Sequence, residues 1–174
     1  MGVLSPASRR RPLPSPAAAD DGDQLHFCST CAFSDACLSQ GFDKSALMDL
    51  HVLVEHVGPF REGEHIFREG DERHEFFLLL NGRVALEMMA QGKALRVHTL
   101  EGGDELGWSS VIVGRGKLFQ ARALEPVEAL AFDGYALLER CRADTGFGYK
   151  IMHRLLGVVS ERLQAARLQV LDMY

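Results

Sequence analysis

The sequence predicts a mainly β domain with flanking helices, followed by one long C-terminal helix. Between Phe60 and Asp133, strand-length apolar runs alternate with glycine turns. Regular turns between short strands are typical of sandwiches and barrels rather than of alternating strand–helix units. From about Thr145 to Met173, the apolar residues instead repeat with a helical period.

The composition fits one globular domain with appendages. The chain has 174 residues, of which 47% are hydrophobic, so a sizeable core can form. Its formal net charge of −5 argues against a nucleic-acid footprint spread over the whole domain. No apolar run has the length of a transmembrane helix, and no apolar stretch of the kind found in secretory signals follows the N-terminal arginines. We therefore expect a cytoplasmic protein that does not enter the membrane.

Residues 1–24 are expected to form a disordered tail, because they are rich in Pro, Ala, Ser, Asp and Arg and lack a hydrophobic period. Residues 25–41 form a cysteine-rich segment. In it, Cys28, Cys31 and Cys37 follow the spacing C-x2-C-x5-C. In a reducing cytosol, cysteines clustered in this way more often ligate a metal than form disulfides.

Residues 42–144 comprise the β domain and a helix that leads into it. Leucines and valines at helical spacing predict this helix over Phe42–Val57, and Gly58-Pro59 would end it. Asn81-Gly82 predicts a two-residue hairpin turn, because both central positions of such a turn favour positive φ. Six runs have the length of strands: His65–Arg68, Glu75–Leu80, Arg83–Met89, Leu95–Leu100, Lys117–Leu124 and Val127–Phe132.

Two helices with polar caps are expected after the strands. Asp133 can cap a short helix that continues through Cys141, and Asp144 can cap the long helix of residues 145–174. The long helix carries one apolar stripe: Ile151, Leu155, Val158, Val159, Leu163, Ala166 and Val170. Because a helix of this length exceeds the surface of a small β domain, we expect the stripe to pair with its copy in a homodimer. The alternative is a helix folded back on its own domain.

Several motifs in the β region resemble the cyclic nucleotide-binding domain family. The segment Phe67–Asp71 and the strand ending in Gly82-Arg83-Val84 are similar to turns of the family's β-roll. Leu100–Gly107 resembles the approach to the family's phosphate-binding cassette, and Ala121–Pro126 resembles the strand that leaves it. The resemblance implies a double-stranded β-helix, a jelly-roll-like β-roll, followed by the family's dimerisation helix.

The resemblance also implies a ligand pocket beside the cassette. In the family, backbone N–H groups and an arginine bind a cyclic phosphate, and a glutamate takes the ribose hydroxyl. Here Trp108 replaces the glutamate, and Lys117 stands near the arginine, where it supplies charge but no bidentate fork. The sequence therefore argues against cyclic nucleotide binding, and a different ligand or none is expected. The predicted pocket residues are Leu106, Gly107, Trp108, Ser109, Ser110, Lys117 and Leu118.

The cysteine-rich segment resembles that of the oxygen-sensing fumarate–nitrate reductase regulators, which hold a [4Fe–4S] cluster through thiolates. Cys28, Cys31 and Cys37 match their spacing, whereas the place of the fourth family cysteine falls at about Leu130. Three interpretations remain open. The first is a cluster whose fourth ligand is Cys141 or a non-cysteine residue. The second is a zinc site in which His26 or His51 completes Cys28, Cys31 and Cys37. The third is unligated thiols packed under the β domain.

These observations predict a non-enzymatic sensory and regulatory module. No arrangement of histidines, serines or paired carboxylates indicates catalysis. The leading hypothesis is redox or oxygen sensing through an N-terminal iron–sulfur cluster, with a homodimer formed through the C-terminal helix. The alternatives are a small-ligand module that regulates a partner protein, or the effector part of a transcription regulator. No helix-turn-helix pattern and no basic patch follow the long helix, so no DNA-binding domain is expected in this chain.

Overall fold

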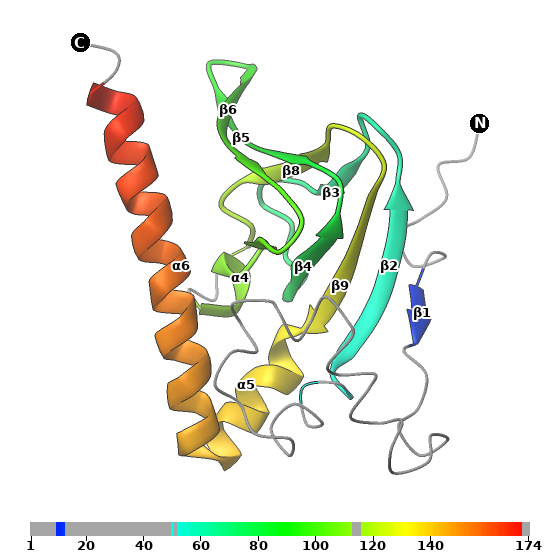
Figure 1. Ribbon diagram of the computed structural model, residues 1–174, viewed down its shortest axis with the longest axis vertical. Helices are drawn as coiled ribbons and strands as arrows, with labels where there is room; N and C mark the ends of the chain where they lie inside the picture. Colours follow the sequence, from blue (N-terminus) through cyan, green and yellow to red (C-terminus); the bar gives the residue numbers. More distant parts are fainter. Residues whose placement is uncertain (1–9, 13–49, 51, 113–115, 172–174) are drawn as a thin grey trace.

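In the computed structural model, the residues that the structure describes are 10–12, 50, 52–112 and 116–171. They form two antiparallel sheets with helices along one side (Figure 1). The strands are β1 (Arg10–Pro12), β2 (Val54–Phe60), β3 (His65–Phe67), β4 (Glu75–Asn81), β5 (Val84–Ala90), β6 (Lys93–Leu100), β7 (Glu105–Leu106), β8 (Gln120–Ala123) and β9 (Val127–Asp133). The helices are α4 (Ser109–Ile112), α5 (Gly134–Ala143) and α6 (Thr145–Leu171).

The two sheets enclose one apolar interior. One sheet has the strand order β1-β2-β9-β4-β7, and the other has the order β3-β8-β5-β6. Together they form a β-roll, so the predicted mainly β fold with flanking helices is confirmed. We call its buried cluster the interior core: Val57, Phe60, Ile66, Phe67, Phe77, Leu79, Val84, Leu100, Leu106, Ala121, Ala123, Val127, Ala129 and Ala131.

A second core lies on the other face of the first sheet, under the helices. Alternate residues of β4 and β9 point to this side, and the rings of Phe76 and Phe132 stack there with centroids 4.5 Å apart. Because both faces of these strands are buried, their sequences are continuously apolar rather than alternating. We call the second cluster the helix-side core: Leu50, Val54, Phe76, Leu78, Val111, Leu130, Phe132, Leu137, Phe147, Ile151 and Leu155.

Both predicted helix caps are confirmed. The side chain of Asp133 accepts hydrogen bonds from the N–H groups of Tyr135 and Ala136 at the start of α5. Asp144 accepts from the N–H of Phe147 at 3.0 Å and so begins α6. These caps satisfy donors that have no partner inside a helix. None of the described helices combines the length and the apolarity that a bilayer crossing requires.

The predicted helix over Phe42–Val57 is wrong at its C-terminal end. Residues 54–60 form β2, which pairs with β9 in an antiparallel register. Val54 packs into the helix-side core and Val57 into the interior core, on opposite faces of the sheet. Two buried faces produced an apolar spacing that imitates a helix. Of the remaining predicted helix, Leu50 is helical, whereas residues 42–49 and 51 lie outside the described residues.

The hairpin predicted at Asn81-Gly82 is also wrong. It joins β4 to β5, which belong to different sheets, so the turn connects the two layers. Gly82 has a φ of 82°, and a Cβ there would overlap the carbonyl oxygen of Pro126. The actual two-residue turn joins β5 to β6 at Gln91-Gly92, where φ is 51° and 77°.

The segment expected to be a disordered tail contains one strand. Arg10–Pro12 forms β1 and pairs with Glu55–Val57 of β2. Without β1, β2 would be the edge strand of the first sheet. An edge strand exposes unpaired backbone N–H and C=O groups, with which an extended segment can pair. Apart from residues 10–12, the predicted tail lies outside the described residues.

Candidate functional site

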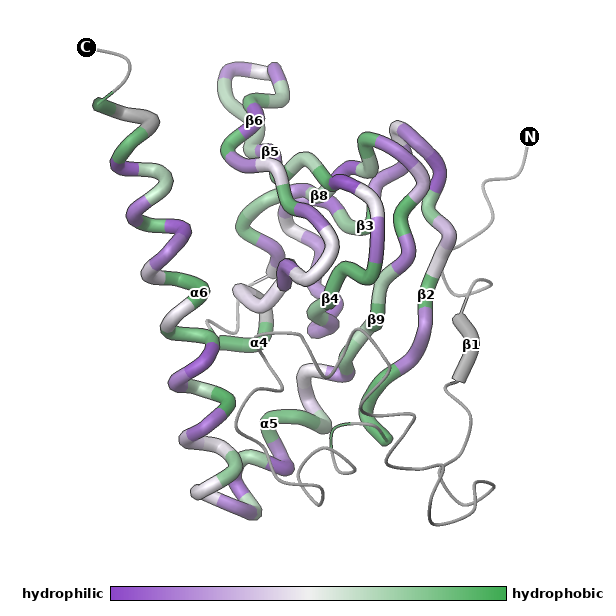
Figure 2. Tube along the Cα trace, viewed as in Figure 1, coloured by the Kyte–Doolittle hydropathy of each residue, from purple (hydrophilic) through white to green (hydrophobic). Residues whose placement is uncertain are grey.

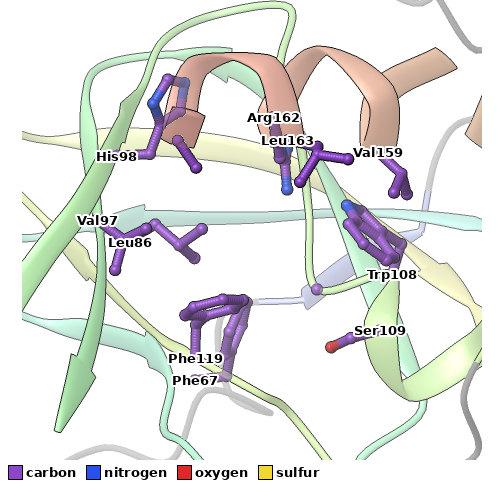
Figure 3. Close-up of a pocket in the computed structure, with 12 residues that line it drawn as sticks. Phe67, Leu86, Val97, His98, Trp108, Ser109, Phe119, Val159, Arg162 and Leu163 are labelled. Atoms are coloured by element: carbon purple, nitrogen blue, oxygen red, sulfur yellow. The ribbon is translucent and has the colours of Figure 1, made fainter. Parts of the chain in front are cut away.

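A cavity of about 250 Å³ lies between the β-roll and α6. Its walls come from the roll on one side and from the middle of α6 on the other (Figure 3). We call it the α6 cavity. Its lining residues are Phe67, Leu86, Val97, His98, Gly107, Trp108, Ser109, Phe119, Val159, Arg162, Leu163 and Ala166.

The turn after β7 places Trp108 at this cavity. Gly107 has a φ of 81°, and a Cβ at this position would lie 3.0 Å from the Lys117 ammonium and 3.2 Å from the Phe67 ring. Glycine is therefore needed both for the backbone conformation and for the close approach. The chain then enters α4 directly, which holds the Trp108 ring under α6. The indole Nε1 of Trp108 is buried and has no hydrogen-bond partner.

Arg162 reaches the same space from α6. Its guanidinium lies over the Trp108 ring, 5.8 Å from the ring centroid, and it donates a hydrogen bond to the carbonyl oxygen of Glu105. The Glu105 side chain is buried below the helix, with its Oε1 lacking a hydrogen-bond partner. Burial raises the pKa of this carboxyl, and the nearby guanidinium only partly opposes that shift. A buried, partly satisfied polar group therefore lies where the helix meets the roll.

Lys117 is turned away from the cavity into the protein. Only 2% of its surface is exposed, and its ammonium donates to the carbonyl oxygens of Gly107, at 2.7 Å, and Glu75. It also lies 5.1 Å from the centroid of the Phe67 ring. Burial lowers its pKa to about 8, because the charged form loses its hydration. The charge expected to meet a ligand phosphate is thus bound to backbone carbonyls.

The structure brings three of the seven predicted pocket residues to the cavity: Gly107, Trp108 and Ser109. Leu106 is instead buried in the interior core. Leu118 is 48% exposed. The side chain of Ser110 lies outside the described residues, although its backbone belongs to α4.

Sequence reasoning missed the α6 wall of the cavity. Val159, Leu163 and Ala166 were assigned to a stripe that pairs with a second chain, yet all three line the cavity. Arg162, which also lines the cavity, is not part of that stripe. The available signal was an arginine adjacent to the apolar stripe on the helix that follows the roll, but no spacing rule connects it to Trp108.

The predicted metal ligands Cys28, Cys31 and Cys37 lie outside the described residues. Cys141 is a free thiol on α5, half-buried against the helix-side core, and burial raises its pKa. Leu130, at the place of the family's fourth cysteine, is buried in the same core. Within residues 10–12, 50, 52–112 and 116–171, no three His, Cys, Asp or Glu side chains are grouped to hold a metal.

With fold and cavity defined, comparison with known proteins identifies the class. Residues 58–144, half of the chain, match the sequence model of the cyclic nucleotide-binding domain. The chain belongs to this family. The fumarate and nitrate reduction regulatory protein of Vibrio cholerae is 26% identical over 105 residues, which are 60% of this chain and 41% of that protein. The chain therefore spans less than half of this curated relative.

Solved structures agree on the fold. A cyclic nucleotide-binding domain from Methylobacillus flagellatus superposes with a TM-score of 0.70 at 19% identity, over 76% of this chain and 75% of that chain. The catabolite activator protein of Thermus thermophilus gives a TM-score of 0.64 at 24% identity, over 79% of this chain and 62% of that chain. These similarities confirm the β-roll with its C-terminal helix.

Proposed function

We propose that this chain is a non-enzymatic, cytoplasmic sensory module in which a small ligand in the α6 cavity controls the position of α6. The strongest support is that α6 contributes both to the helix-side core and to the wall of the α6 cavity. Ile151 and Leu155 are buried in the helix-side core, whereas Val159 and Arg162 line the cavity. A ligand that contacts roll and helix together favours one arrangement of α6 through its differential affinity.

A cyclic nucleotide is a poor candidate for this ligand, although the chain belongs to the cyclic nucleotide-binding family. Lys117 binds backbone carbonyls, and Trp108 stands in place of the glutamate that takes a ribose hydroxyl. Losing both polar contacts removes the basis for selecting a cyclic phosphodiester. Titration calorimetry with cyclic AMP and cyclic GMP should give no binding heat. Micromolar or tighter binding of either nucleotide would contradict this.

The output of the module is proposed to be a homodimer formed through α6. The side chains of Tyr149, Leu156 and Leu163 are 69%, 63% and 64% exposed and recur at seven-residue intervals. We call these three residues the exposed stripe; of them, only Leu163 belongs to the stripe predicted from the sequence. Large apolar side chains at this interval are typical of helices that pair with a second helix. Figure 2 shows that hydrophobic positions continue to the C-terminal end of α6. A second copy of this chain is the partner that this stripe fits best.

Sedimentation velocity tests the dimer. Leu156→Glu places a charge in the exposed stripe of Tyr149, Leu156 and Leu163 without touching the cavity lining, and it should shift the protein from dimer to monomer. Leu168→Glu is the matched control, because Leu168 is also exposed on α6 but lies off the stripe. A wild-type protein that stays monomeric at micromolar concentration contradicts the proposed dimer, and so does equal behaviour of the two variants.

A second candidate function is redox or oxygen sensing through an iron–sulfur cluster. Its support is the spacing of Cys28, Cys31 and Cys37, together with the similarity to a fumarate and nitrate reduction regulatory protein. Cluster thiolates supply soft anionic ligands, and loss of the cluster would change the charge that the cysteine-rich segment carries. Zinc held by the same cysteines is the alternative cofactor. Cys141 is the least supported of the proposed ligands, because it lies outside the C-x2-C-x5-C spacing.

Anaerobic purification followed by iron, sulfide and zinc analysis separates these possibilities. The cluster proposal expects a coloured protein that contains iron and sulfide. Cys31→Ala should lose both, whereas Cys141→Ala should keep them if a non-cysteine residue is the fourth ligand. A colourless protein that carries zinc or no metal contradicts the cluster.

The wider role of the chain follows from its relatives only as a proposal. We infer that the module is either the effector part of a transcription regulator or a sensor that acts on a separate protein. The relatives carry names of a regulatory protein and of an activator, and this chain spans 41% and 62% of their lengths. No DNA-binding domain is seen in the part of the chain that the structure describes. A sequence-specific gel shift with this chain alone would contradict a purely sensory role.

A further inference from the structure

The α6 cavity has a mainly apolar wall and a few polar groups at one end. Most of its wall is apolar, and three aromatic rings contribute, from Phe67, Trp108 and Phe119. In Figure 3, Phe67 and Phe119 lie together on the wall opposite α6. The remaining apolar lining is aliphatic: Leu86, Val97, Val159, Leu163 and Ala166. A flat apolar group is the kind of ligand that such walls accommodate.

The polar groups at the α6 end of the cavity are hydrogen-bond donors. Arg162 carries five N–H donors, and the Glu105 carbonyl accepts from one of its nitrogens. The indole N–H of Trp108 is buried and has no partner. Figure 3 shows the Trp108 nitrogen and the Arg162 guanidinium on the same side of the cavity, with Ser109 below them and His98 at the far end. No Asp or Glu is among the described lining residues.

One unpaired buried donor, the Trp108 N–H, together with the fixed positive charge of Arg162 calls for an acceptor that carries negative charge. The Trp108 N–H bears the cost of an unsatisfied buried group, and a ligand oxygen would remove this cost. A guanidinium binds a carboxylate with two parallel hydrogen bonds, which a lysine ammonium does not reproduce. The cavity volume of about 250 Å³ lies just below the about 300–1,000 Å³ of typical ligand sites, so the ligand is small.

We propose that the α6 cavity binds a small aromatic carboxylate, with its ring against Phe67 and Phe119 and its carboxylate on Arg162 and the Trp108 N–H. This inference rests on the proposed sensory function and names the class of ligand. The ring contacts the roll while the carboxylate contacts α6, so the ligand bridges the two parts of the molecule. A neutral aromatic lacks the second contact, and a cyclic nucleotide brings a ribose 2′-hydroxyl for which the described lining holds no carboxylate partner.

The chain provides its own reporter, because Trp108 is its single tryptophan and lines the cavity. Titration with phenylacetate should change the tryptophan fluorescence to a saturating value, and calorimetry should give the same dissociation constant. Phenylacetamide keeps the ring but loses the charge. It should bind about 10- to 100-fold more weakly, the value of a hydrogen bond to a charged group.

Variants assign the contacts. Arg162→Gln should weaken the binding of phenylacetate by about 10- to 100-fold. Arg162→Lys should recover only part of this loss, because an ammonium cannot make the two parallel hydrogen bonds of a guanidinium. Arg167→Gln is the matched control, since it removes an exposed arginine of the same helix that does not line the cavity. Trp108→Phe, followed by calorimetry, should cost about 2- to 10-fold. Thermal melting establishes that each variant is folded.

Several results would overturn the proposal. Equal binding of phenylacetate and phenylacetamide would show an apolar cavity without anion selectivity. Binding that Arg162→Gln and Arg162→Lys leave unchanged would place the acid elsewhere. Failure of benzoate, phenylacetate and indole-3-acetate to bind the folded wild-type chain would exclude the ligand class. These outcomes leave the sensory proposal intact. That proposal fails separately, if a bound acid leaves the monomer–dimer distribution of the chain unchanged.

Discussion

The two halves of α6 share one helix but have opposite environments. In the N-terminal half, Ile151, Leu155 and Val158 are 0%, 1% and 8% exposed. In the C-terminal half, Leu163, Leu168 and Leu171 are 64%, 58% and 66% exposed. The first half is fixed by apolar contacts, whereas the second depends on what lies against it. The α6 cavity, with Arg162, lies where one half passes into the other.

This contrast suggests how a small binding event has a larger effect. A packed core has one arrangement, and changing it costs several kcal/mol. A helix half without such contacts can change position at a lower cost, so a small ligand at the boundary can bias it. The anchored half then sets the reference from which the second half moves.

Adjacent leucines provide the sharpest test of the contrast. Leu155 is 1% exposed and Leu156 is 63% exposed. Leu155→Ala leaves a cavity in the helix-side core and should lower the free energy of unfolding by about 2–5 kcal/mol. Leu156→Ala should change it by less than about 0.5 kcal/mol in dilute, monomeric protein. Urea unfolding at low protein concentration measures both, and similar losses would mean that the two halves are equally packed.

A substitution at Lys117 tests the part of the β-roll that lies next to the α6 cavity. Burial lowers its folded pKa to about 8, below the ordinary value of 10.5. Between these values the unfolded chain binds more protons than the folded chain, so stability should rise with pH. The gain relative to Lys117→Met should reach about 3 kcal/mol near pH 10.5. Urea unfolding of both proteins over this range checks it, and parallel pH profiles would show that the Lys117 ammonium remains hydrated.

The sequence could predict those features of the fold that depend on residues close together in the chain. Asp133 and Asp144 cap their helices through N–H groups two or three residues away, so the information is complete within one turn. Most strand runs were equally visible, because strands such as β4, β8 and β9 are largely buried and therefore apolar. Val54 and Val57 misled because the two faces of β2 are buried in different cores, which removes the two-residue period.

The site depended on contacts between distant segments. Arg162 and Trp108 lie on different elements, and only the packing of α6 on the roll brings them together. The family pattern pointed to Trp108, which lines the α6 cavity. It did not reveal that the Lys117 ammonium binds the carbonyl oxygens of Gly107 and Glu75. Which way a long side chain turns is decided by packing, which the sequence pattern does not contain.

A substitution at Glu105 tests the contact between α6 and the β-roll. The Glu105 carbonyl oxygen accepts a hydrogen bond from Arg162 of α6, and the Glu105 carboxyl is buried. Burial raises the folded pKa of this carboxyl above the ordinary value of 4.5. The stability that it contributes is therefore present below about pH 4.5 and is lost as the pH rises through the folded pKa. Glu105→Gln should be more stable than wild type at neutral pH by about 1–3 kcal/mol, and equal to it in acid.

Thermal and urea unfolding across pH measure the effect of Glu105→Gln. Glu62→Gln is the matched control, because it removes an exposed carboxylate that does not act on Glu105 or Arg162, and it should leave the pH profile unchanged. A loss of stability in Glu105→Gln at neutral pH would mean that attraction between the carboxylate and Arg162 outweighs burial. The boundary would then be held by an ion pair instead of being weakened by a buried acid.

Two glycines of α6 give the smallest and most discriminating comparison. A Cβ at Gly148 would lie 2.7 Å from the carbonyl oxygen of Cys141, whereas a Cβ at Gly157 would meet nothing within 4 Å. Gly148→Ala must separate α5 from α6 and should cost about 1–3 kcal/mol. Gly157→Ala only restricts the unfolded chain and favours helix, so it should add about 1 kcal/mol.

The sign of each change in thermal unfolding decides the comparison. If Gly157→Ala is more stable and binds phenylacetate with unchanged affinity, ligand binding does not require α6 to bend at residue 157. Weaker ligand binding in a protein that is more stable would instead identify Gly157 as the point at which α6 bends between its anchored and exposed halves. In that case the stability gained by the helix is lost by the ligand-bound arrangement, which needs a less regular backbone.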